Sequence, residues 1–200
     1  MSLHRITDGV WQLRSYPPHA INCWLLGDVL VDAATRWARG RILHDLRKRT
    51  LSMVALTHCH PDHQGLAALI CEERKIPLAC HALDVPAMEG RTPLQPDNWI
   101  LRLGKRVWSG PPHPVARVLR EGDEVAGFRV IHAPGHTPGH IILFRDSDRV
   151  AIAGDVLANF NFLKMRVELA QPPPFFSVDP AERPSGPLAF LDDLEHVLNT

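Results

Sequence analysis

The sequence has 200 residues, of which 45% are hydrophobic and 22% are charged, the balance of an ordinary globular domain. Basic and acidic residues both number 22, so the formal net charge is zero and the basic excess typical of nucleic-acid or anionic-membrane binding is absent. No stretch approaches the roughly 20 apolar residues that cross a bilayer, the start lacks a signal-peptide layout, and the four cysteines form no CxxC pair. We therefore expect a cytoplasmic enzyme or binding protein, with no nucleic-acid or membrane partner. The oligomeric state is open.

The first third of the chain predicts short strands followed by one helix. The spacing of Ala38, Ile42, Leu43 and Leu46 indicates an amphipathic helix over 36–49. The predicted strands before it are apolar runs bounded by turn residues: "GVWQL" (9–13), "INCWLLG" (21–27) and "DVLVDAA" (28–34).

The next segment predicts a strand, a helix and a strand. "LSMVALTH" (51–58) is nearly continuous in apolar residues, as in a strand buried on both faces. Pro61 suits the first turn of a helix, "GLAALICEERK" (65–75) continues the helix, and "IPLAC" (76–80) returns as a strand. This order is typical of a layered α/β protein.

The second half predicts a helix, two hairpins and a terminal helix. The helix covers 98–108, within a Pro- and Gly-rich excursion over 84–114. The first hairpin joins "ARVL" (116–119) to "FRVIHA" (128–133) through a turn at 121–123, and the second joins 140–146 to 149–155. The chain is then irregular, until a helix predicted over 188–199.

A cluster of metal-ligand side chains follows the buried strand. In extended backbone, residues two apart point to the same side, so His58 and His60 converge while Cys59 faces away. Asp62 and His63 then emerge from the first helical turn. Four such side chains at one strand end indicate a metal site.

Two later stretches offer further ligands. "APGHTPGH" supplies His136 and His140 among glycines that allow close backbone approach, and "VAIAGD" ends in Asp155. Each follows an apolar strand. Ligands from several strand ends that meet at one sheet edge are how layered α/β proteins build their sites.

These elements together resemble the metallo-β-lactamase superfamily. The similarity rests on "HCHPDH" from His58 to His63, "PGHTPGH" around His136 and Gly154-Asp155, and it spans most of the chain. It implies an α/β (α+β) fold, a four-layer αβ/βα sandwich of two mixed sheets with helices outside. It also implies that the metals lie at one edge between the sheets.

The resemblance assigns roles residue by residue. His58, His60 and His136 would bind a first metal, and Asp62 and His63 a second. Asp155 would bridge the two ions, Asp32 would be a structural aspartate near them, and His140 would hydrogen-bond rather than ligate. Two zinc ions are expected, although iron or manganese suits the same ligands.

The resemblance is incomplete at the end of the chain. Members with a complete dinuclear site have one more histidine in a Gly-His loop after the last helix. Here His196 lies within the predicted helix and does not match that loop. We therefore expect a single domain over residues 1–200 that lacks the final strand and its histidine.

The leading hypothesis is a metal-dependent hydrolase of the glyoxalase II-like type, in which a metal-activated hydroxide attacks a small ester, thioester or lactone. Asp62 would orient the nucleophile and move its proton. The segment after Asp155 is either a structural loop or part of the substrate site. In the second case Asn159, Asn161, Lys164 or Arg166 would contact the polar end of the substrate, with Phe160 and Phe162 as apolar wall.

Other functions stay open. "THCH" also resembles mononuclear iron persulfide dioxygenases, whose ligands would be His58, His136 and Asp155. An RNase Z-type nuclease is disfavoured by the neutral charge, a β-lactamase proper by the expected cytoplasmic location. A non-catalytic descendant is a further alternative.

Overall fold

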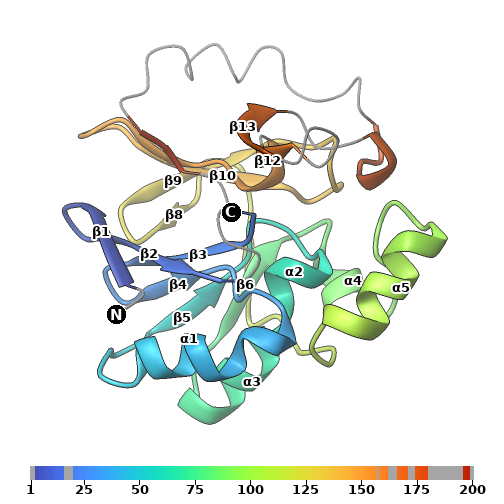
Figure 1. Cartoon of the computed structure of the whole chain (residues 1–200), viewed down its shortest axis with the longest axis horizontal. Coiled ribbons are helices and arrows are strands. Elements are labelled where there is room, and N and C mark those ends of the chain that lie inside the picture. The colour runs from blue at the N-terminus through green and yellow to red at the C-terminus, as the bar shows by residue number, and fades with distance from the viewer. Residues whose placement is uncertain are drawn as a thin grey trace.

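Two mixed β-sheets packed face to face form the centre of the computed structural model (Figure 1). The structure describes residues 3–15, 20–156, 158–161, 166–170, 174–179 and 196–198. Helices α1 and α3 cover the face of the first sheet that points away from the second sheet (Figure 1). The α/β sandwich of two mixed sheets is therefore confirmed.

The first sheet has seven strands in the described part of the chain, in sequence order from β1 to β7. The strands from β1 to β4 pair antiparallel, and those from β4 to β7 pair parallel. Their bounds are β1 (Leu3–Thr7), β2 (Val10–Arg14), β3 (Asn22–Leu26), β4 (Val29–Val31), β5 (Met53–Ala55), β6 (Leu78–His81) and β7 (Arg117–Leu119). Strand β1 is not among the sequence-based predictions.

The second sheet has the order β14-β11-β10-β9-β8 in the described part of the chain. Strands β8 to β11 form an antiparallel meander, and β14 pairs parallel with β11. The bounds are β8 (Glu124–Val125), β9 (Phe128–His132), β10 (Ile141–Arg145), β11 (Val150–Ile152) and β14 (His196–Leu198). A separate hairpin pairs β12 (Ala158–Asn161) with β13 (Arg166–Ala170).

Helices form in three of the four segments predicted to be helical, within 36–49, 61–75 and 98–108. Pro61 is the first residue of α2, where its missing N–H costs nothing, and the Asn98 side chain caps α5 by accepting from the Leu101 N–H. The helical bounds are η1 (Arg36–Ala38), α1 (Arg39–Leu46), α2 (Pro61–Gln64), α3 (Ala67–Arg74), α4 (Val85–Met88), α5 (Trp99–Trp108), η2 (Gly154–Val156) and η3 (Pro174–Phe176), with η marking 3-10 turns. Within the described residues, no helix has both the length and the apolar character needed to cross a bilayer.

The core lies in layers because alternate strand residues point to opposite sheet faces. On β3, Trp24 and Leu26 join the cluster between the two sheets, whereas Cys23 and Leu25 join the cluster under the helices. A central strand buried on both faces therefore has an unbroken apolar sequence.

Two predictions about the second half are wrong. The 116–119 segment does not pair with β9, because it forms β7 in the first sheet. The hairpin partner of β9 is β8, joined to it by Ala126-Gly127 with positive φ at both residues, the pattern of a tight hairpin turn. Residues 196–198 are strand β14 rather than helix, since their backbone pairs with β11. Residues 188–195 of that predicted helix lie outside the described residues.

Candidate metal centre

The predicted metal ligands all follow strand ends, and two of them, Asp62 and His63, lie in helix α2. The β5–α2 loop carries His58 and His60, the β9–β10 loop carries His136, and Asp155 lies in η2 directly after β11. A hydrogen bond from the Ile141 N–H to the Thr57 carbonyl, 2.9 Å long, joins the loop of the first sheet to the second sheet. The site therefore lies where the two sheets meet at one edge.

Three buried imidazoles form a first cluster. His58, His60 and His136 are 0–3% exposed, and each offers one ring nitrogen within 4.8 Å of the others. Their ring centroids lie 4.5–4.7 Å apart. The fold therefore brings together three histidines from two loops that lie far apart in the sequence.

Hydrogen bonds fix which nitrogen of each ring is left for an ion. The Nε2 of His60 lies 2.7 Å from the Gln95 carbonyl oxygen, which only accepts, so Nε2 carries the proton and Nδ1 keeps its lone pair. The Thr57 hydroxyl donates to Asp32 and lies 3.1 Å from Nδ1 of His58, so Nδ1 donates and Nε2 keeps the lone pair. Metal-bound histidines are commonly oriented in this way.

The fit to a cation is seen in the buried nitrogens that lack a hydrogen-bond partner. Nδ1 of His136 lies 3.3 Å from the Ser177 hydroxyl, which leaves Nε2 facing the cluster. Nε2 of His58 and Nε2 of His136 are both buried, and neither makes a hydrogen bond in the described part of the chain. Buried polar atoms of this kind are rare, and a metal ion would satisfy both.

A second cluster is richer in carboxylates. Nε2 of His63 lies 3.4 Å from Asp155 Oδ1 and 3.8 Å from Asp62 Oδ2. The other oxygen of Asp155, Oδ2, lies 3.4 Å from Nε2 of His136 in the first cluster. Asp155 therefore lies between the two clusters. The family resemblance implies a bridging ligand at this place.

Asp32 anchors the second cluster from behind. Its buried carboxylate accepts from the Thr57 N–H and hydroxyl, both at 2.8 Å, and contacts Nδ1 of His63 at 3.0 Å. Its φ of 58° turns the chain sharply after β4, so that the Ala33 N–H bonds the His63 carbonyl. The expected structural role of Asp32 near the metals is supported by these contacts.

The electrostatics of the first cluster favour neutral imidazoles. Burial lowers the pKa of His58 and of His136 well below the usual histidine value, and neighbouring imidazoles lower both further. Both rings are then uncharged at neutral pH. A neutral imidazole is the form that binds a metal.

The second cluster favours positive charge. Burial alone would lower the pKa of His63, but the carboxylates of Asp155, Asp62 and Asp32 raise it well above the usual value. Burial opposes ionisation of Asp155, yet His63 and His136 hold its pKa below the ordinary range. Three carboxylates around one imidazole thus make a site suited to a cation.

The sequence model of the metallo-β-lactamase superfamily matches residues 16–194, which is most of the chain. The chain belongs to the metallo-β-lactamase superfamily. Members of this family are generally metal-dependent hydrolases. The candidate metal site of this chain has two groups of ligand atoms within 4.8 Å of one another, which share His58: His58, His60 and His136 form one, and His58, His63 and Asp155 form the other. Asp62 lies beside the second group, 3.8 Å from Nε2 of His63.

Curated relatives and solved structures agree with the family. A Bacillus subtilis (strain 168) protein named "Probable metallo-hydrolase YflN" is 32% identical over 76% of this chain and 66% of its own length, so the chain spans just under two thirds of that relative. The hydroxyacylglutathione hydrolase GloC of Haemophilus influenzae is 26% identical over 68% of the chain and 66% of its own length. The crystal structure of TTHA1623 in a di-iron-bound form superposes with a TM-score of 0.57, at 24% identity, over 96% of this chain and 85% of that one.

His140 accepts a hydrogen bond from the backbone of Asp155. The Asp155 N–H donates to Nε2 of His140 at 3.0 Å, and His140 belongs to neither group of metal-ligand atoms. Gly154 allows this approach, because a Cβ there would lie 2.6 Å from the same nitrogen. The structure thus favours the predicted hydrogen-bonding role of His140 over direct ligation.

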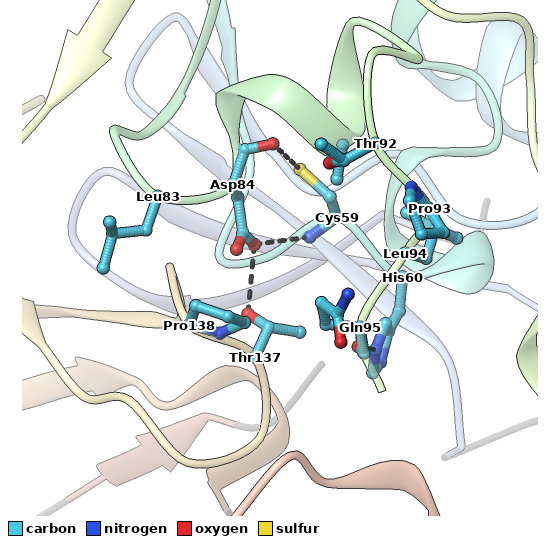
Figure 2. A pocket seen from close by; sticks show the side chains of 11 residues that line it. Cys59, His60, Leu83, Asp84, Thr92, Pro93, Leu94, Gln95, Thr137 and Pro138 are labelled. Carbon is cyan, nitrogen blue, oxygen red and sulfur yellow. Dashed lines mark hydrogen bonds between the residues drawn. The ribbon is translucent and has the colours of Figure 1, made fainter. Parts of the chain in front are cut away.

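A small pocket lies behind the His60 ring (Figure 2). His60, Gln95, Leu83 and Pro138 line it, together with the buried carboxylate of Asp84. Cys59 points toward Asp84, with its Sγ 3.7 Å from the Asp84 carbonyl oxygen. It is a buried side chain of the core, as predicted, and it does not point at the three-histidine cluster.

Sequence reasoning missed three groups that hold the site. The Gln95 carbonyl and the Ser177 hydroxyl orient ligand histidines, and Asp84 hydrogen-bonds both ligand loops. The sequence pattern could have identified Asp84, because this residue follows a buried strand as Asp32 and Asp155 do. Gln95 and Ser177 carry no such signal.

Some predicted residues are not tested by the structure. The side chains of Asn159, Phe160, Asn161, Phe162, Lys164 and Arg166 lie outside the described residues. The backbone of His196 pairs with Val150, five residues before Asp155, and its side chain is likewise outside that part. The absence of the family's final strand and histidine remains a prediction.

Proposed function

We propose that this chain is a dinuclear metal-dependent hydrolase of a small ester, thioester or lactone. The observation that carries the proposal is the position of Asp155. Its two carboxylate oxygens each lie 3.4 Å from one imidazole, His63 in one cluster and His136 in the other. Two ligand sets that share a carboxylate support two neighbouring ions.

In this proposal the residues divide between two zinc ions. Nε2 of His58, Nδ1 of His60 and Nε2 of His136 would hold the first, Asp62 and His63 would hold the second, and Asp155 would contribute to both. When bound, the ions supply Lewis acidity that makes water a nucleophile near neutral pH and polarises a carbonyl group. The neutral imidazoles of the first cluster are ready to bind without losing a proton.

Asp62 is the residue proposed to handle the proton. Its side chain is 27% exposed, against 3% for His63, so it faces the solvent side of the site. Burial raises the pKa of Asp62 above the usual aspartate value, which makes its carboxylate a better proton acceptor. Asp62 would therefore orient the attacking water and carry its proton to the leaving group.

Relatives support the substrate class and leave the metal to experiment. GloC is named as a hydrolase of hydroxyacylglutathione, a thioester, and YflN as a metallo-hydrolase. We place thioesters first among the substrates for that reason. Imidazole and carboxylate ligands suit zinc, iron and manganese alike.

The test is metal analysis joined to a substrate screen. Protein purified from medium containing zinc, iron and manganese should carry close to two ions per chain and hydrolyse a hydroxyacylglutathione, a lactone or a simple ester. His58→Ala should lose the metal and the activity while staying folded. The exposed His44 gives the control His44→Ala, which should retain both.

Other results would overturn the proposal in defined ways. A single iron with oxygen consumption on a persulfide would assign the chain to dioxygenase chemistry through His58, His136 and Asp155. Phosphodiester cleavage with steep salt dependence would assign it to nucleases. A folded chain that takes up no metal would point to a non-catalytic family member.

A further inference from the structure

A buried carboxylate outside the predicted ligand set links the two loops that carry the first cluster. Asp84 follows β6, directly before α4, and is 3% exposed. Its Oδ2 accepts from the Cys59 N–H at 3.1 Å and from the Thr137 hydroxyl at 3.0 Å (Figure 2). Its Oδ1 accepts from the Gly139 N–H at 2.8 Å.

Each of these donors is a chain neighbour of a histidine in the site. Cys59 lies between His58 and His60, and Thr137 directly follows His136. One carboxylate therefore joins loops from different sheets at the residues next to all three imidazoles. We infer that Asp84 is a positioning residue: it holds His58, His60 and His136 close enough together to bind the same ion. This inference rests on the proposed metal centre and concerns affinity rather than chemistry.

The surrounding chain is built around the Asp84 carboxylate. A Cβ at Gly139 would lie 2.5 Å from Oδ1 and 2.7 Å from the Asp84 N, so the glycine is required for this approach. The Asp84 carbonyl accepts from the Ala87 and Met88 N–H groups, which fixes the residue at the start of α4. The backbone of Asp84 is thus fixed by α4, and its carboxylate is fixed by the three hydrogen-bond donors.

The side chain at residue 84 must accept hydrogen bonds at both of its terminal atoms, as a carboxylate does. All three partners donate, so an amide at residue 84 would direct its N–H₂ at another donor and leave buried groups unpaired. Asp84→Asn keeps the size of the side chain but breaks the link. Thr137→Val removes one of the three hydrogen bonds at equal volume, and Thr137→Ser keeps it.

Asp32 is the equivalent anchor for the other cluster. Asp32 contacts Thr57 and His63, whereas Asp84 contacts the neighbours of His60 and His136. Loss of Asp84 should therefore weaken the three-histidine site before the carboxylate-rich site. A general loss of structure would weaken both sites together, so a selective loss at the three-histidine site identifies a positioning role.

The experiment is cobalt titration of the purified full chain in competition with a chelator, read by the visible spectrum of bound Co²⁺. We expect Asp84→Asn to raise the dissociation constant of the first ion about 10–100-fold and to change its spectrum. Thr137→Val should show a smaller rise of the same kind, and Thr137→Ser should restore the wild-type value. Thermal unfolding of the metal-free forms gives the folded fraction for each variant.

Ile42→Ala, a buried substitution in α1 on the far side of the first sheet, is the matched control for lost stability. It should lower the unfolding temperature without changing cobalt affinity. Wild-type affinity in folded Asp84→Asn, or an equal loss in Ile42→Ala, would overturn the inference. If Asp84→Asn does not fold, Thr137→Val against Thr137→Ser decides. Missing hydrolysis with intact cobalt binding would count against the proposed function alone.

Discussion

The main-chain N–H of Asp155 donates a 3.0 Å hydrogen bond to Nε2 of His140. His140 is fully buried, and burial lowers its pKa to about 3, so the ring stays neutral and Nε2 keeps the lone pair that accepts this bond. His140 therefore contributes to the site through the position of Asp155, the residue between the two clusters.

His140→Leu tests this contribution. The substitution leaves the Asp155 N–H without its acceptor, and we expect metal affinity to fall about 10–100-fold, as for other residues that orient ligands. Metal titration of the purified variant measures the effect, with His44→Leu on the surface as control. Unchanged affinity in His140→Leu would contradict the role given to this histidine.

Ser177→Ala tests the orientation of His136. The Ser177 hydroxyl lies 3.3 Å from Nδ1 of His136, and its removal frees the ring to rotate. We expect a loss of first-ion affinity of about tenfold, with little change in the unfolding free energy of the metal-free protein. Chelator competition and urea unfolding measure the two quantities. A stability loss without an affinity loss would show that Ser177 only packs.

Gly65→Ala tests how tightly the end of helix α2, which carries Asp62 and His63, packs on the loop after Asp32. A Cβ at Gly65 would collide with the backbone of Ala34 and lie 2.6 Å from the Thr35 carbonyl carbon. We expect a stability loss of at least about 2 kcal/mol. Gly40→Ala is the matched control, since Gly40 lies in α1 with no atom within 4 Å of its Cβ position. It should be neutral or stabilising by about 0.5–1 kcal/mol. Denaturant unfolding of both variants checks the contrast.

His81 predicts a pH dependence of stability. Burial, and after it the stacked ring of His132 with its centroid 4.1 Å away, lower the pKa of His81 to about 4. Between pH 6.5 and 4 the unfolded chain therefore binds a proton that the folded chain does not, so this stability is present above pH 6.5 and is lost as the pH falls toward 4.

We expect His81 to account for about 1–2 kcal/mol of that loss, allowing for solvent near the ring. His81→Phe keeps a flat ring against His132 and removes the titrating group. Urea unfolding at pH 7 and pH 4.5 should show a smaller loss in His81→Phe than in the wild type or in His44→Gln. Equal losses in all three proteins would exclude His81 as the source.

The sequence predicts that the candidate ligands meet at one sheet edge because these residues follow strand ends. The period-two geometry of extended backbone and the convergence of strand ends at one sheet edge are local rules, and they place His58, His60 and Asp155 without knowledge of the partner sheet. Buried strands such as β3 and the proline-initiated helix α2 are visible for the same reason.

The remainder depends on contacts between distant segments. Whether 116–119 pairs with β9 or with β6 is decided by the path of the chain between sheets, which periodicity does not encode. The Gln95 carbonyl is a backbone group that any residue would supply. Ser177 lies 41 residues from His136, and no local pattern marks a lone serine at that distance.

Hydrogen bonds with Thr57, Gln95 and Ser177 orient the three imidazoles of the first cluster toward one point without an ion. A zinc finger, in contrast, is unfolded until its ion arrives. A chain with a rigid, ready-made cradle can exchange its ion without refolding. In the proposed metal centre, the metal that the cell supplies would then decide which ion is bound, and the rate of the proposed hydrolysis would follow that supply while the amount of folded protein stays constant.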